Sequence, residues 1–103
     1  MANYVPHHRK KIEQLERKEA ALIRLIERSA TQDRLLEAAR KVRDCRIAVV
    51  RAKQNEMHPC DRVGFVNAEE KIRQLQDNTE PDVLFEFIRL VETGKAPLIR
   101  TTN

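Results

Sequence analysis

Residues 12–49 read IEQLERKEAALIRLIERSATQDRLLEAARKVRDCRIAV, and apolar positions recur at matched distances on either side of the tripeptide at 29–31. The matched pairs are Ile26 with Leu35, Leu22 with Ala38, Leu15 with Cys45 and Ile12 with Val49, and the residue numbers of each pair add to 60 or 61. A constant sum is the register of two antiparallel helices, because a step along one helix is matched by a step back along the other. Residues 7–57 are therefore predicted to form a long helical hairpin.

The turn of this hairpin is predicted to be very short. Ser29 is followed three residues later by Gln32, which is typical of a capping box, so we expect the second helix to begin at about Ala30. His58 precedes Pro59, and the residue before a proline is disfavoured in helical backbone, so we expect the helix to end just before that point.

Two shorter helices are expected over residues 67–93. They follow a connection at 58–66 that contains a proline and a glycine. Asn67, with Glu70 three residues later, is typical of a helix N-terminus, so we expect the third helix to begin there.

The fourth helix is predicted to begin at Thr79, with Asp82 completing its cap, and to stop at Gly94. Phe85 lies off its apolar face, and residues 94–103 form a tail without periodicity. The apolar face consists of Val83, Leu84, Phe87, Ile88, Leu90 and Val91.

The composition agrees with an all-α fold. Charged residues make up 35% of the 103 residues and aromatic residues 4%, with two glycines, which is typical of long, well-solvated helices rather than of sheet. We therefore expect residues 1–103 to form a single α-helical domain with a bundle-like arrangement.

The second helix carries a second apolar stripe that one partner helix cannot cover. A 26-residue helix is about 40 Å long, whereas a fourth helix of about 14 residues covers about 21 Å of it. Self-association as a homodimer would complete a bundle, so we expect a non-enzymatic protein that acts as a protein–protein interaction, regulatory or adaptor module. The expected subunit or partner contact consists of Leu36, Ala39, Ile47 and Val50.

Charge distribution supports nucleic-acid binding as the alternative. Residues 1–60 contain 14 Lys or Arg against eight Asp or Glu, while residues 61–103 contain six against eight. Glu37 and Asp44 lie at helical spacing among the basic residues, and interleaved acids weaken phosphate binding. The basic residues of this alternative are Arg40, Arg43, Arg46, Arg51 and Lys53.

Four possible metal or thiol ligands, His7, His8, His58 and Cys60, lie at the end of the hairpin where its first helix starts. The register separates His8 from His58 by about six residues of helix, or about 9 Å, which argues partly against convergence on one ion. The irregular segment after Pro59 could still turn Cys60 back toward the histidines, which leaves a metal site as the alternative. We expect no metal and no cofactor.

Glu19 interrupts the apolar stripe of the first helix, and we expect a cation of the second helix to hold its carboxylate. No phosphate-binding glycine loop, nucleophile–base pair or carboxylate pair accompanies it, so we predict no catalytic residue.

Two cysteines form no disulfide framework, and the chain opens without a signal-like segment, so we expect a cytoplasmic protein. No apolar run approaches the length of a membrane span.

Overall fold

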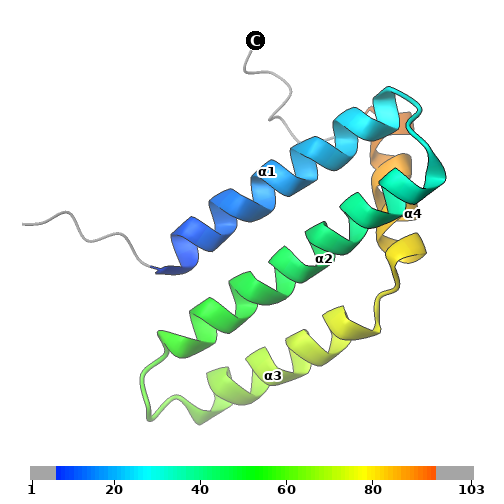
Figure 1. The fold of residues 1–103 in the computed structure, drawn as a ribbon. Coiled ribbons are helices and arrows are strands. Elements are labelled where there is room, and N and C mark those ends of the chain that lie inside the picture. Colours follow the sequence, from blue (N-terminus) through cyan, green and yellow to red (C-terminus); the bar gives the residue numbers. More distant parts are fainter. Residues whose placement is uncertain (1–6, 95–103) are drawn as a thin grey trace, which may run out of the picture.

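The computed structural model describes residues 7–94, which contain four α-helices and no strand. The helices are α1 (His7–Glu27), α2 (Gln32–Asn55), α3 (Arg62–Asp77) and α4 (Glu80–Glu92). In Figure 1, α1 and α2 form an antiparallel hairpin, α3 lies along the other side of α2, and α4 passes behind the hairpin near its turn. The predicted all-α, bundle-like fold and its helical hairpin are confirmed.

The turn between α1 and α2 is built differently from the prediction. Ser29 has a φ of 56°, its N–H donates to Ile26 O at 3.0 Å, and Ala30 N–H donates to Leu25 O at 3.0 Å. These two bonds form a Schellman motif, which ends α1. The predicted capping box at Ser29 is wrong, because a left-handed residue that ends one helix cannot also be the extended N-cap of the next. The N-cap of α2 is Thr31, and its side chain makes no capping bond.

The main core lies where α4 crosses the hairpin, at the end that contains the turn, which we call the closed end. Phe87 of α4 is 1% exposed, and Leu22 of α1 and Val42 of α2 are fully buried beside it. The apolar face predicted for α4 is confirmed, since its other members are either buried or packed against the same cluster. The cluster of buried residues consists of Leu22, Ile23, Ala38, Ala39, Val42, Val83, Leu84 and Phe87.

The start of α4 is also as predicted. Thr79 is its N-cap: the Thr79 hydroxyl accepts from Asp82 N–H at 3.2 Å, and the Asp82 carboxylate accepts from Thr79 N–H at 3.3 Å. Such a reciprocal cap satisfies two of the backbone donors that a helix start leaves unpaired.

Helix α3 begins five residues earlier than predicted, at Arg62. Asp61 is its N-cap, and its carboxylate accepts from Gly64 N–H at 2.9 Å. A Cβ at position 64 would lie 2.8 Å from Asp61 Cγ, so glycine leaves room for this cap. The prediction at Asn67 was wrong because Gly64 was taken as a helix breaker, whereas it is the third residue of the helix.

At the other end of the hairpin, which we call the open end, α3 extends the layer instead of covering it. Among the described helices α3 contacts α2 only, while α4 contacts both α1 and α2. The described part of the molecule is accordingly flat, with extents of 47 × 37 × 22 Å. The buried apolar side chains of this region are Val49, Ala52, Ala68, Ile72 and Leu75.

The predicted tail at 94–103 lies outside the described residues, apart from Gly94. Gly94 has a φ of 72°, a left-handed conformation that glycine adopts without steric cost, and it follows the C-cap Thr93 of α4.

Candidate interaction surfaces

The four residues expected at a subunit or partner contact divide into two pairs. Ala39 is fully buried, and Leu36 packs against the cluster that contains the α4 side chains. Ile47 and Val50 are partly buried. Ile47 lies four residues after Arg43, which bonds to the residue following α3, so it shares the side of α2 that α3 covers. The molecule's own C-terminal helices therefore account for much of this stripe.

The basic residues of the nucleic-acid alternative are largely ion-paired. Arg40 lies between Glu37 and Asp44 on α2, and Arg40 Nη1 is 3.2 Å from Asp44 Oδ2. Arg43 reaches Glu80 at 3.2 Å and donates to Asn78 O at 3.1 Å. Arg43 also lies 3.6 Å from Asp44 of α2, so its charge is balanced both within its own helix and by Glu80 at the start of α4.

Two further arginines of this set follow the same pattern. Arg46 binds Glu86 of α4 with two hydrogen bonds of 3.1 and 2.7 Å, and Arg51 binds Glu69 of α3 at 3.1 Å. Lys53 is exposed and forms no ion pair within residues 7–94. Arg43, Arg46 and Arg51 thus dock the C-terminal helices, and Arg40 is paired within α2. These four arginines offer little free charge to phosphates.

Arg46 connects three helices. Its guanidinium lies 5.4 Å from the centre of the Phe87 ring, it is bound by Glu86, and its Nη2 is 4.0 Å from Glu19 Oε2. Burial raises the pKa of the Glu19 carboxyl, and the Arg46 charge opposes that rise. The expected partner cation for Glu19 is present, but its closer bonds go to Glu86.

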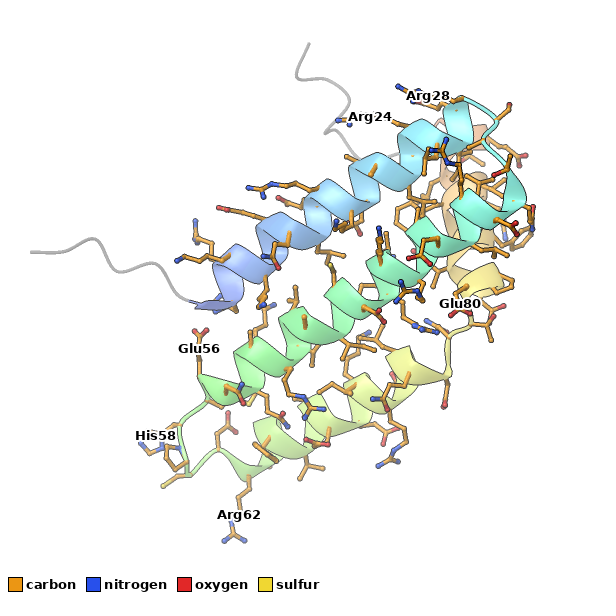
Figure 2. The ribbon with its side chains drawn as sticks, viewed as in Figure 1. Arg24, Arg28, Glu56, His58, Arg62 and Glu80 are labelled. Atoms are coloured by element: carbon orange, nitrogen blue, oxygen red, sulfur yellow. The ribbon has the colours of Figure 1, made fainter. Side chains whose placement is uncertain are left out.

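At the open end, Glu56 holds the first turn of α1. Its carboxylate accepts from the His8 backbone N–H at 2.8 Å and lies 2.9 Å from His8 Nδ1. Figure 2 shows Glu56 pointing from the end of α2 toward the start of α1, with His58 on the connection beyond it. A carboxylate at a helix N-terminus satisfies free backbone donors, so His8 has a structural partner.

Among the described side chains, His8, His58 and Cys60 do not form a metal-binding group. His58 Nδ1 accepts from the backbone N–H of Cys60 at 3.1 Å, so this nitrogen is occupied by main chain. Across residues 7–94 no three His, Cys, Asp or Glu side chains are grouped to hold a metal ion, and the His7 side chain lies outside what is described. Burial raises the pKa of the Cys45 thiol, which lowers its reactivity.

The sequence analysis missed an exposed apolar surface at the start of α3. Val63 is 72% exposed, Val66 62% and Phe65 50%. Val63 and Val66 lie about 60° apart around α3, and we call this pair the α3 apolar face, whereas Phe65 lies about 160° from Val63 on another side of the helix. They were assigned to a connecting loop, where isolated apolar side chains attract no attention. The signal was three large apolar residues within four positions, directly after a possible Asp N-cap.

No match was found when the chain was compared with family models, with curated proteins and with solved structures. None of the helices within residues 7–94 is both long enough and apolar enough to cross a membrane.

Proposed function

We propose that this protein is a non-enzymatic helical module that self-associates, as a homodimer, and acts in the cytoplasm by binding another protein. The observation that carries the proposal is the exposure of Val63 and Val66, which lie side by side on α3. Contiguous exposed apolar side chains on a small protein are typical of contact surfaces, because water contact with them is unfavourable.

The α3 apolar face makes no contact with the other described helices of the molecule. Ala68, Ile72 and Leu75 form the buried stripe of α3 against α2. Val63 and Val66 lie on the opposite side of the helix, at 100° per residue. Within residues 7–94 no helix contacts this side of α3, so it is open to a second molecule.

Charge on the same side of α3 favours a second copy as the subunit partner. In an antiparallel α3–α3 contact centred on Val66, Arg62 of one chain lies across from Glu70 of the other. Arg62 is exposed and forms no ion pair with the residues described here, and Glu70 is exposed and lies 3.0 Å from Arg73 of its own helix, so Arg62 would join an existing ion pair. A two-fold contact would repeat this pairing on both sides of the axis. The two ion pairs would then fix the alignment of the helices, and the valines would bury apolar surface.

The test is sedimentation equilibrium of the wild type and of the Val63→Asp/Val66→Glu variant. We expect a concentration-dependent dimer for the wild type and a dissociation constant at least about 100-fold higher for the variant, because each acid would be buried without a partner. Asp in the first turn of α3 is compatible with the helix dipole, so circular dichroism should report unchanged helix content.

The matched control is Gln14→Glu/Gln32→Glu, which adds the same charge at exposed positions of α1 and α2, away from α3. It should dimerise as the wild type does. A wild type that stays monomeric at high concentration, or a variant that dimerises unchanged, would refute the self-association proposal.

A further inference from the structure

A groove lies between α1 and α2 at the closed end, on the face of the hairpin opposite α4. Its volume is about 470 Å³, and its floor consists of Ala21, Leu25 and Ala38. Lys41 on its rim and Arg43, which binds Glu80, are two residues apart on α2 and so point to nearly opposite sides of that helix. The groove is therefore separate from both the α4 contact and the α3 apolar face.

The rim of this groove carries cations that have no ion-pair partner within residues 7–94. Lys18, Arg28, Arg34 and Lys41 line it, and none of them forms an ion pair or side-chain hydrogen bond with the described residues. Figure 2 shows Arg28 projecting from the end of α1 at the closed end. This contrasts with the arginines at positions 40, 43, 46 and 51 of α2, all of which are ion-paired.

The acids at the rim offset only part of this positive charge. Asp33 and Glu37 line the groove as well. Glu37, however, is bound by Arg40, which lies outside the groove and holds the pKa of the Glu37 carboxyl below its usual value. The groove thus combines an apolar floor with an excess of free positive charge.

From this combination we infer that the groove between α1 and α2 binds an acidic segment of a partner protein, with an apolar side chain on the floor and carboxylates at the rim. This inference rests on the proposed role as a binding module, but not on self-association. An acidic segment gains from both features, because long Lys and Arg side chains can cover its apolar residue while pairing with its carboxylates.

Other occupants fit the groove less well. Nucleic acid gains from the cations but not from an apolar floor, and no aromatic side chain lines the groove for base stacking. Residues 95–103 of this chain contain Lys95 and Arg100 and no acidic side chain, so the positive charge of the rim would repel them. Asp33 and Glu37 also repel a phosphate backbone, whereas a protein segment can place a neutral or basic residue beside them.

The test is selection of peptides from a displayed library of random 16-residue sequences on the full-length wild type. We expect enrichment of peptides with Asp or Glu around one or two aliphatic residues. Their dissociation constants should rise with salt, and should rise at least about tenfold for the Lys18→Glu/Arg34→Glu variant. Arg34 lies in the first turn of α2, where an acid is compatible with the helix, so the variant should fold.

The control variant is Lys10→Glu/Lys71→Glu, which changes the charge equally at exposed positions outside the groove and should bind the peptides within twofold of the wild type. Sedimentation of both variants separates this test from that of self-association. The inference is overturned if no peptide is enriched, if the enriched peptides lack acids or if they bind the groove variant equally well. Tighter, groove-dependent binding of a 20-base-pair DNA duplex, or loss of dimer in the groove variant, would also overturn it.

Discussion

The closed and open ends of the hairpin are built from similar amphipathic helices, yet only one of them encloses a core. At the closed end α4 crosses both α1 and α2, and aromatic and aliphatic side chains from three helices are fully buried. At the open end α3 lies beside α2 alone, and two of its buried positions, Ala52 and Ala68, hold small side chains.

The difference shows that the placement of a helix matters more than its sequence pattern. A helix laid across a hairpin adds a second layer and buries side chains from both sides. A helix laid alongside it extends the first layer and leaves its own outer face exposed. We therefore expect the closed end to supply most of the stability, while the open end leaves apolar side chains of α3 exposed.

The largest expected effect separates two phenylalanines of α4. Phe87→Ala should lower the free energy of unfolding by about 3–5 kcal/mol. Phe87 is buried at the closed end, and the substitution also removes the contact between its ring and Arg46. Phe85→Ala, at a position 62% exposed, should change it by less than about 0.5 kcal/mol. Urea denaturation of both variants measures the difference, and similar losses would break the comparison between a buried and an exposed face.

The open end depends on one buried polar side chain. Gln54 is 4% exposed, and its amide donates to Phe65 O at 3.2 Å and to Glu69 Oε2 at 2.8 Å. Gln54→Ala should cost about 1–3 kcal/mol by removing both bonds from the α2–α3 contact. Gln76→Ala, at an exposed position of α3, is the control and should be close to neutral in the same denaturation experiment. Equal effects would mean that α3 is not held by this contact.

The turn at the closed end stores conformational cost at Ser29. Ser29→Gly should raise the free energy of unfolding by about 0.5–1 kcal/mol, because glycine adopts a φ of 56° without the penalty that a Cβ brings there. Ser29→Ala keeps the Cβ and should give no gain. A loss of stability in the glycine variant would show that the serine side chain supports the turn in some other way.

The smallest effect concerns the pH dependence of Glu19. Burial raises its pKa in the folded state, so its contribution to stability is present when the carboxyl is protonated and is lost as pH rises through that pKa. Glu19→Gln should therefore be more stable than the wild type at pH 7, by less than about 1 kcal/mol. The difference in stability between the two proteins should disappear as pH falls toward 4.5, the ordinary pKa of a glutamate side chain. Unfolding titrations at several pH values measure it, and a less stable glutamine variant at pH 7 would mean that the Arg46 pairing outweighs the burial.

The hairpin and α4 could be predicted from the sequence because local and long-range signals coincide there. The constant register of pairs such as Ile26 with Leu35 requires an antiparallel return, and the pair Thr79 and Asp82 specifies the start of α4 in backbone hydrogen bonds. Both signals are fully contained in residue spacing.

The start of α3 and the side of α2 that it covers could not be predicted in the same way. Glycine usually disfavours a helix, but at position 64 the Asp61 carboxylate lies close to where a Cβ would be, so glycine suits the third residue of α3. Likewise, the ion pairs of Arg43, Arg46 and Arg51 depend on how α3 and α4 are placed, which sequence spacing does not specify. The unpaired cations of the groove could not be predicted for the same reason, because they differ from the paired arginines of α2 only in lacking acidic partners on other helices.

Native-state hydrogen exchange, at a protein concentration too low for dimerisation, tests most directly whether the two ends differ in stability. We predict that the amides of α3, such as those of Ile72 and Leu75, exchange through an opening that costs clearly less free energy than exchange of the closed-end amides of Leu22, Val42 and Phe87. A single opening free energy shared by all five amides would contradict the division of the molecule into a stable closed end and a weakly held open end.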